Sequence, residues 1–554
     1  MTPTSKSPLD PSLPTKAQAI ITWGHLYGSA GGLTIATAAL HHAAPVIVIT
    51  EDTQAALRLD TELRFFSAGS DLPILSFPDW ETLPYDHFSP HQDIISQRLT
   101  ALYHLPGLKR GVLIVPAATL MQRVAPRIFL EANSLLLKVG DAFDMEGMRK
   151  RLEAGGYRCV SQVIEHGEFA VRGALVDLFP MGSELPYRID LFDAQVETIR
   201  TFDPETQRTL EKFEAIHLLP AREFPLTEDA ITQFRQAFRQ RFEGDPNRSP
   251  IYRDISRGLA PAGIEYYLPL FFERTDTLFD YLPPASLVIA QDGSGEAAKH
   301  FWTQASERYE QLRHDVERPL LAPEQLFLTP KEITKGSAAF PGVRLQRFEQ
   351  PDTQGAAPVI TYASAAPPPL PIDGRSTHPT AALKSFLAGF DGRVLFAAES
   401  AGRREALLDL LRGNEIHPKP FEGWQAFLDS DARLGITIGA LEQGLLLTDP
   451  ALAVIAEPQL FGARALQQRR RKAAVRDAEN VVRNLAELAV GAPVVHENHG
   501  VGRYLGLQML TVGDMEAEFL TLEYAGGDKL YVPVSSLHLI SRYTGAAPEN
   551  APLH

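Results

Sequence analysis

The stretch GEFAVRGALVDLFPMGSELPYRIDLFDAQVETIRTFDPETQRT, from Gly167 to Thr209, decides how this chain folds. In the run 174–179, Ala174, Val176 and Leu178 fall on one face and Leu175 and Phe179 on the other, and in the run 187–192 the apolar residues 187, 189 and 191 share one face. Successive side chains of a strand point to opposite faces, so this alternation is typical of strands. The Pro-Met-Gly-Ser segment 180–183 cannot continue a strand and indicates a turn. A third run follows at 196–202, and the whole pattern predicts an antiparallel meander.

The second of these strands carries an unusual face. Opposite Tyr187, the side chains of Arg188, Asp190 and Phe192 share one side of the strand. Arginine and aromatic residues are enriched in the energetic centres of protein–protein interfaces, so Arg188 and Phe192 are candidate contact residues. The alternative is an ordinary surface arginine, with Phe192 in a second core.

The sequence motifs of this stretch resemble those of a known domain. The motifs GEF-x-VRG-x-L-x-DLFP, YRIDLFD and FDPETQRT resemble domain 2 of the nucleotide-excision-repair protein UvrB. They are still more similar to the UvrB-like module of the bacterial transcription-repair coupling factor family (Mfd). In that family the domain docks onto the protein UvrA. The resemblance implies that Arg172, Arg188 and Phe192 are the UvrA-binding positions.

Length, charge and cysteine content limit the possible domain organisation and binding partners. A chain of 554 residues is too long for a single core, and about three to five domains are expected. The formal net charge of −15 predicts weak sequence-independent DNA binding, although it is compatible with a local basic patch. The single cysteine, Cys159, allows no intramolecular disulfide, as is usual in the bacterial cytoplasm, where we expect this protein.

Targeting and metal signals are missing from the sequence. The first residues lack the basic-then-apolar order of a signal peptide. No apolar run reaches the roughly 18 residues that span a bilayer, so no membrane association is expected. The 16 histidines form no HExxH-like pattern, and we assign neither a metal site nor catalytic residues. His496 and His499 lack a third ligand and are taken as structural.

Residues 20–125 have the apolar runs and helical patterns of an α/β domain, with a glycine-rich segment at 26–34. A functional phosphate-binding loop requires Gly-x4-Gly-Lys-Ser/Thr. When the segment is aligned on Thr34, Leu33 stands at the lysine position and Tyr27 at the first glycine, and no Gly-Lys dipeptide occurs in the chain. We therefore predict no ATP site. The degenerate, non-functional loop comprises Gly28, Gly31, Gly32, Leu33 and Thr34.

Two further segments are ambiguous from their composition. The stretch 77–93, FPDWETLPYDHFSPHQD, is aromatic, acidic and rich in proline. A catalytic cluster is one interpretation, but an ordered loop that packs its aromatic rings is favoured, and the stretch resembles coupling factors. The run Arg469-Arg470-Arg471-Lys472 opens a predicted helix at 464–488. Such a run is usually a solvated face, and a nucleic-acid or acidic-protein contact stays open.

The last unit, residues 491–543, is all-β in pattern. The runs 519–524 and 529–534 flank a Gly-Gly turn and predict a hairpin, with Pro533 indicating an edge or a bend. The motifs VHENHGVGRY and YVPVSSLHLISRY resemble the RNA-polymerase-interacting domain of coupling factors, a Tudor-like fold shared with CarD-type regulators. That domain adds its sheet edge to a strand of the polymerase β subunit. The resemblance implies contacts by Arg503, Tyr504, Leu507 and Leu510.

The predicted fold class is a multidomain α/β protein. It contains a UvrB-like degenerate P-loop domain with an inserted α+β domain built on an antiparallel sheet, a second small α/β domain, and a C-terminal Tudor-like all-β barrel. The predicted boundaries are 1–130 and 226–350 for the two parts of UvrB-like domain 1, 131–225 for the UvrA-binding domain, 351–379 for a Pro/Ala/Gly-rich linker, 380–462 for the small α/β domain, 463–490 for a basic linker helix and 491–554 for the RNA-polymerase-interacting domain.

The resemblance covers essentially the whole chain, which we expect to be the N-terminal part of a longer coupling factor. The translocase motor, with its ATP and Mg²⁺, would follow it, and DNA would be contacted mainly through that motor. The chain is thus predicted to be a monomeric, non-enzymatic adaptor without a cofactor in transcription-coupled nucleotide-excision repair, with UvrA and the polymerase β subunit as partners. The alternatives are an ATPase or nuclease, and a UvrB-like DNA-damage-binding protein, whose DNA-clamping hairpin we cannot identify here.

Overall fold

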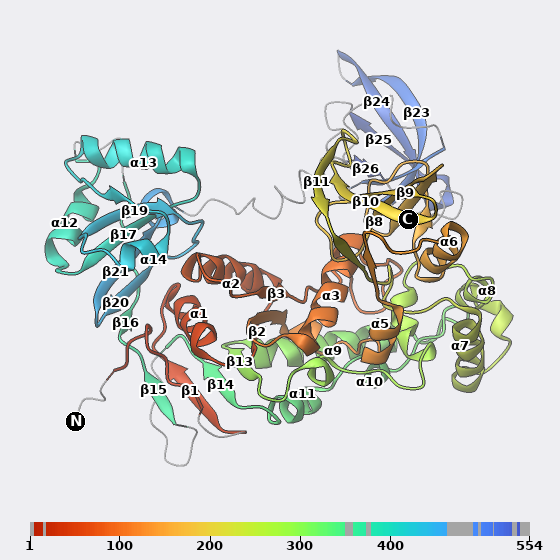
Figure 1. Ribbon diagram of the computed structural model, residues 1–554, viewed down its shortest axis with the longest axis horizontal. Coiled ribbons are helices and arrows are strands. Elements are labelled where there is room, and N and C mark those ends of the chain that lie inside the picture. The colour runs from red at the N-terminus through yellow and green to blue at the C-terminus, as the bar shows by residue number, and fades with distance from the viewer. Residues whose placement is uncertain are drawn as a thin grey trace. The chain divides into compact units, whose positions relative to one another are not determined.

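The computed structural model (Figure 1) describes residues 5–14, 18–348, 358–372, 378–462, 491–496, 500–512, 515–533 and 540–542. The chain forms two compact units. The larger comprises 1–86, 90–259 and 264–463, and the smaller comprises 87–89, 260–263 and 464–554. Each unit is described by itself.

A seven-stranded, wholly parallel sheet organises the first part of the larger unit, in the order β15-β1-β14-β13-β2-β4-β3. The predicted strands at its centre are confirmed, and every residue of β2 and β4 is buried, as expected when helices cover both faces of a parallel sheet. The strands are β1 (Ile20–Gly24), β2 (Val46–Thr50), β3 (Ile74–Ser76), β4 (Val112–Pro116), β13 (Leu287–Gln291), β14 (Gly342–Leu345) and β15 (Val359–Thr361).

Helices and one long loop accompany this sheet. The side chain of Asp52 caps the second helix by accepting a hydrogen bond of 2.7 Å from the Ala55 amide. The loop after β3 packs Phe77, Trp80 and Tyr85 into the core, as predicted for an ordered aromatic loop. The helices here are α1 (Ala30–His41), α2 (Thr53–Phe66), α3 (Gln92–His104), α4 (Ala117–Leu120), α5 (Arg127–Asn133), α9 (Ser294–Leu312), α10 (Pro323–Leu326) and α11 (Pro330–Ser337).

The predicted antiparallel meander is confirmed and lies within a six-stranded sheet of order β11-β10-β9-β8-β7-β6. A small two-stranded sheet, β12-β5, and helix α6 (Met145–Ala154) complete this region. The strands are β5 (Leu135–Lys138), β6 (Arg158–Cys159), β7 (Glu168–Arg172), β8 (Leu175–Phe179), β9 (Tyr187–Phe192), β10 (Gln195–Phe202), β11 (Thr209–Phe213) and β12 (Ala215–Leu218).

A helical hairpin follows this region. Helix α7 runs over Glu228–Arg241 and helix α8 over Pro250–Ser256. Thr227 caps α7, since its side chain accepts from the Ala230 amide, and Pro250 stands at the first turn of α8, where its missing N–H costs nothing. Phe234 and Phe238 of α7 pack on Tyr252 of α8, so the two helices share one small aromatic core.

A second, smaller α/β layer follows, with sheet order β16-β20-β21-β17-β19-β18. The Pro/Ala/Gly-rich segment 351–379 is more than a flexible tether, because it supplies β15 to the first sheet and β16 to this one. The elements are β16 (Ser364–Ala365), β17 (Arg393–Ala398), β18 (Lys419–Pro420), β19 (Leu434–Ile438), β20 (Leu445–Thr448), β21 (Ala451–Ala456), α12 (Ala381–Gly389), α13 (Ala401–Gly413), α14 (Trp424–Leu428) and α15 (Glu457–Phe461).

The smaller unit holds a five-stranded antiparallel sheet of order β25-β24-β23-β22-β26. Strand β25, which ends at Pro533, lies at an edge, as the proline predicts. Among the described residues β25 and β26 do not pair with each other, so a closed barrel is not observed. The strands are β22 (Pro493–His496), β23 (Gly500–Val512), β24 (Met515–Glu523), β25 (Lys529–Pro533) and β26 (Ile540–Arg542).

Candidate protein-binding surfaces

One face of the β6–β11 sheet carries a row of charged side chains. The strand register places Asp177 of β8, Arg188 of β9, Arg200 of β10 and Lys212 of β11 next to one another. Opposite charges on directly opposed strand positions attract each other. Attraction between neighbouring charges therefore holds the side chains of this row in place. The position of Arg188 depends on Asp177, and that of Arg200 depends on Asp190.

Arg188 is held by a buried carboxylate. Its Nε and Nη2 donate to the two oxygens of Asp177 at 2.7 and 2.9 Å, and its Nη1 donates to the Gln207 carbonyl at 3.2 Å. The guanidinium carbon lies 4.7 Å from the centroid of the Phe202 ring. The Arg188 side chain is only 16% exposed and that of Asp177 only 3%. Hydrogen bonding to Asp177 raises the pKa of Arg188, and Arg188 is not an ordinary solvated arginine.

Arg172 lies beside the same aspartate but faces solvent. Its Nη1 is 3.9 Å from Asp177 Oδ2, its Nη2 donates to the Ser161 carbonyl at 2.7 Å, and the side chain is 47% exposed. One carboxylate thus neighbours both predicted arginines. The structure brings these two residues together and leaves one of them accessible.

Phe192, the third predicted residue, ends β9 with 65% of its surface exposed. The alternative placement in a second core is therefore wrong. A large exposed aromatic ring is a feature of interaction surfaces more than of ordinary solvated faces. Phe192 supplies the apolar part of this surface.

Sequence reasoning assigned no role to the aspartates of this face. Asp177 orders Arg188, and Asp190 accepts hydrogen bonds from Arg200 and Thr198. A signal for Asp177 was available, because it is the single charged residue in the apolar run Leu175–Phe179. Charged residues are rarely buried without a partner, so an arginine at the facing strand position could have been expected.

The glycine-rich turn is packed against another part of the chain. Gly28 has a φ of +55°, and a side chain there would lie 2.2 Å from the carbonyl oxygen of Gly444. That same oxygen accepts a 3.0 Å hydrogen bond from the Ser29 amide, at the helix N-terminus where a phosphate would otherwise bind. Leu33, at the lysine position, is only 1% exposed. The other residues of the degenerate loop, Gly31, Gly32 and Thr34, are buried in α1.

A glutamate fills the space beside this turn. A side chain at Gly32 would lie 2.3 Å from Glu62 Oε2, so only glycine leaves room for the carboxylate. Burial raises the pKa of Glu62 to about 8, against the attraction of Arg58 and with a smaller contribution from Glu442. A carboxyl with so high a pKa is largely protonated at pH 7 and supplies no positive charge to a phosphate, which agrees with the absence of the P-loop lysine.

In the smaller unit, the predicted polymerase contacts are divided between surface and core. Leu507 is 42% exposed on β23, and Arg503 donates from Nη1 to the Gly491 carbonyl at 3.1 Å. Tyr504, in contrast, is 4% exposed and packs in the core of the unit, because its side chain points to the inner face of the sheet. Leu510 belongs to β23 by its backbone, but its side chain lies outside the described residues.

Strand β23 has a partly open edge. On one side it pairs with β24 over Arg503–Val512, and on the other it pairs with β22 over Gly500–Arg503 only. The Tyr504 backbone still bonds to residues 491 and 492, but from Leu505 to Val512 this second edge has no strand partner among the described residues. Unpaired N–H and C=O groups of this kind are a template for an added strand.

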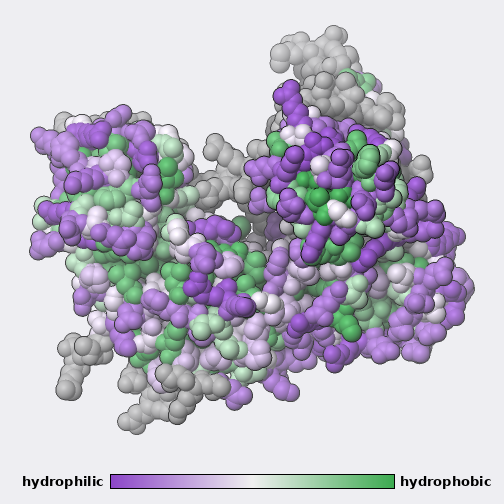
Figure 2. All heavy atoms as spheres, in the orientation of Figure 1, coloured by the Kyte–Doolittle hydropathy of each residue, from purple (hydrophilic) through white to green (hydrophobic). Residues whose placement is uncertain are grey.

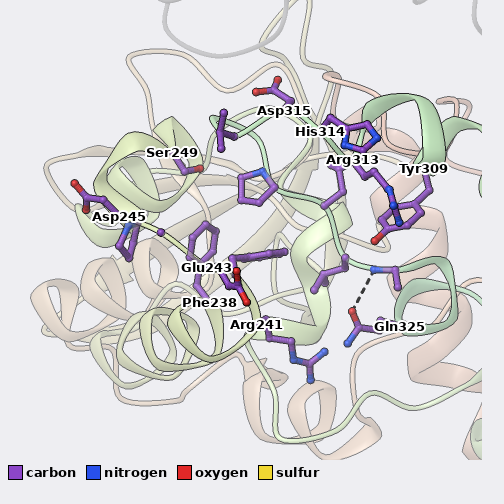
Figure 3. Close-up of a pocket in the computed structure, with 18 residues that line it drawn as sticks. Phe238, Arg241, Glu243, Asp245, Ser249, Tyr309, Arg313, His314, Asp315 and Gln325 are labelled. Carbon is purple, nitrogen blue, oxygen red and sulfur yellow. Dashed lines mark hydrogen bonds between the residues drawn. The ribbon is translucent and has the colours of Figure 1, made fainter.

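Other parts of the chain offer weaker candidates for a functional site. Within the described ranges, no group of three or more His, Cys, Asp or Glu side chains is arranged to hold a metal ion, and no helix has the length and apolar character to cross a bilayer. His499 and the basic run 469–472 lie outside the described residues. A cavity of about 400 Å³ lies beside the end of α7, lined by Phe238, Ser249, Tyr309 and Gln325 among others (Figure 3).

Known families match three parts of the chain. Residues 135–224 match the family described as UvrB interaction domain, 386–460 the MFD, D3 domain, and 488–544 the CarD-like/TRCF RID domain. These matches coincide with the β6–β11 sheet, the second α/β layer and the five-stranded sheet. Together they define a modular protein with two interaction domains separated by an α/β scaffold.

Relatives match almost the whole chain. It is 46% identical over 544 residues to the transcription-repair-coupling factor of Escherichia coli and 44% identical over 547 residues to that of Haemophilus influenzae, covering 98% of this chain in both cases. The factor of Bacillus subtilis is 25% identical over 559 residues. The chain is similar to transcription-repair-coupling factors along nearly its whole length, and it spans about half the length of these relatives, 47% for the first two.

Proposed function

We propose that this chain is an adaptor in transcription-coupled nucleotide-excision repair, which recruits UvrA through the β6–β11 sheet and holds RNA polymerase through the five-stranded sheet. The exposed ring of Phe192, on the same strand face as the Asp177-bound Arg188, is the observation that carries the proposal. An exposed aromatic anchor and a pre-ordered arginine on one face are typical of an interface centre. The match of residues 135–224 to a UvrB interaction domain supports the same assignment.

The polymerase contact is proposed for β23. The open edge from Leu505 to Val512 fits the addition of a strand from the polymerase β subunit, with Leu507 beside it on the exposed face. Arg503 and Leu510 remain candidate contacts, whereas the buried Tyr504 would act by supporting the strand. We further propose that this unit adopts the Tudor-like barrel of its family.

The chain is proposed to bind its partners without catalysis or a cofactor. The carbonyl of Gly444 at the start of α1 and the buried Leu33 support the absence of nucleotide binding at the glycine-rich turn. ATP-driven translocation, and with it most DNA contact, is assigned to the half of the relatives that this chain does not span. We place the protein in the bacterial cytoplasm as a monomer.

A parallel pull-down tests the adaptor. The 554-residue chain is expected to retain purified UvrA and, separately, the polymerase β subunit. Phe192→Ala should abolish UvrA retention and leave the β subunit bound, whereas Leu507→Asp should do the reverse. Leu210→Ala, which truncates another exposed apolar side chain of the same sheet, and Tyr531→Ser on β25 are the matched controls. Retention of neither protein by the unmodified chain would refute the proposal.

A further inference from the structure

The helical hairpin α7–α8 carries a dense group of arginines. The segment 228–258, counted from the first residue of α7, contains six arginines, no lysine and five carboxylates, for a net charge of +1 in a chain whose total is −15. All six side chains belong to exposed residues. The members of this group, called here the arginine surface, are Arg235, Arg239, Arg241, Arg248, Arg253 and Arg257.

The charges of the arginine surface are not neutralised inside the fold. No described carboxylate lies within ion-pair distance of any of the six. Three exposed arginines on other helices have such partners at four residues' separation: Arg64 with Asp60, Arg127 with Glu131 and Arg149 with Glu153. The α7–α8 hairpin differs from those helices in carrying six exposed arginines within one short segment.

Two arginines of α7 contact one aromatic ring of α8. Arg235 Nε is 3.4 Å from the Tyr252 hydroxyl, and the Arg239 guanidinium lies 5.7 Å from the centre of the same ring. Arg253 follows Tyr252 directly in α8. Figure 1 shows α7 and α8 side by side at the right-hand edge of the view, and Figure 2 shows that this edge is mostly hydrophilic. The exposed arginines of the two helices therefore lie on neighbouring elements of a mostly hydrophilic edge.

We propose that the arginine surface binds the phosphate backbone of duplex DNA. Guanidinium groups hydrogen-bond phosphate in a fork geometry, and release of the counterions condensed on DNA drives such binding. At 0.1 M salt charges interact over about 10 Å, so the acidic remainder of the chain is largely screened from the arginine surface. The choice of duplex DNA over another polyanion rests on the proposed role in transcription-coupled repair, which takes place on duplex DNA.

The test is a fluorescence-anisotropy titration of a labelled 25-base-pair duplex with the 554-residue chain, at 50 to 200 mM salt. The variant Arg235→Gln/Arg239→Gln/Arg253→Gln should bind at least tenfold more weakly at 50 mM salt. Its slope of log affinity against log salt should be shallower by up to about 2.7, since each phosphate contact contributes about 0.9. Thermal unfolding of the variant checks that the fold is retained.

The matched control is Arg64→Gln/Arg127→Gln/Arg149→Gln, which removes the same charge from three ion-paired positions. Equal weakening by both triple variants would overturn the proposal, as would no binding by the unmodified chain at 50 mM salt. Tighter binding of RNA of the same length, or of an acidic polypeptide such as polyglutamate, would overturn the assignment to duplex DNA. The titration contains neither UvrA nor polymerase, so its failure is separate from failure of the adaptor role.

Discussion

Two arginine-rich regions of this molecule differ in how their charge is compensated. On the β6–β11 sheet, Arg188 and Arg200 are bonded to Asp177 and Asp190. On the α7–α8 hairpin, six exposed arginines have no carboxylate partner among the described residues. Arginine thus occurs in one region within a network of ion pairs and in the other as uncompensated positive charge.

The difference indicates two modes of recognition. An arginine locked by a bidentate carboxylate has a defined position and little net field, which suits a protein partner of fixed shape. Unpaired arginines retain side-chain freedom and full charge, which suits a uniform polyanion such as a phosphate backbone. Stability should depend on the first group, and salt-sensitive binding on the second.

The largest expected effect is on the stability of the sheet. Asp177→Ala leaves the Arg188 guanidinium without its buried partner and should destabilise the sheet locally by about 3 kcal/mol. Hydrogen-exchange mass spectrometry of the β8 and β9 peptides would measure it. Glu243→Ala beside the arginine surface is the control and should change protection by less than about 0.5 kcal/mol. Equal loss of protection in the two variants would contradict the claim that the sheet arginines, unlike those of the hairpin, contribute to stability.

Salt dependence should separate the two binding modes. Between 50 and 200 mM salt, three phosphate contacts predict a decrease in DNA affinity of about 40-fold. UvrA binding, centred on Phe192 and on compensated arginines, should change by less than about fivefold. Titrations of the same preparation with each partner provide the measurement. Parallel salt curves for both partners would contradict the assignment of two mechanisms.

Truncation of Phe192 should affect binding alone. Phe192→Ala removes an exposed ring and is expected to weaken UvrA binding by about 2 kcal/mol, or about 30-fold. The midpoint of thermal unfolding should not move, because 65% of the ring is already in water. Calorimetry with UvrA and a thermal scan give the two readouts. A lower unfolding midpoint would mean that Phe192 belongs to the packing of the sheet.

The smallest effect is expected at the hairpin. Arg253→Ala and Arg257→Ala should change stability by less than about 0.5 kcal/mol each, because neither side chain has an ion-pair partner. Arg188→Ala should cost more, since it strands the buried Asp177 carboxylate. Chemical unfolding monitored by hydrogen exchange compares them. A loss above 1 kcal/mol at Arg253 would show a structural role for the arginine surface.

The local part of this fold was predictable, and the partner of each strand was not. The alternation in 174–179 and 187–192 predicted β8 and β9, and it placed Arg188 and Phe192 on one face. It did not predict that Asp177 would meet Arg188, because that contact depends on the register between two strands. The alternation also did not decide whether Phe192 is buried or exposed, because it shows which residues share a strand face but not what packs against that face.

Longer-range features were equally out of reach of local patterns. The Pro/Ala/Gly composition of 351–379 predicted a linker, yet Val359–Thr361 adds a parallel strand to β1. The missing lysine predicted an inactive glycine-rich turn, but not the Gly444 carbonyl at the start of α1. Tyr504 was assigned as a contact from the resemblance, and strand alternation could not correct this because it does not say which face is inner.

By itself, the sequence determined the strands of the meander, the central strands of the parallel sheet and the loss of the phosphate-binding lysine, because each depends on residue types within a few positions of one another. The tertiary structure decided which arginines are neutralised and which are free. That distinction depends on carboxylates brought close by strand register or kept away by helix geometry. Pairing energy falls off steeply with distance, and only the folded chain sets those distances.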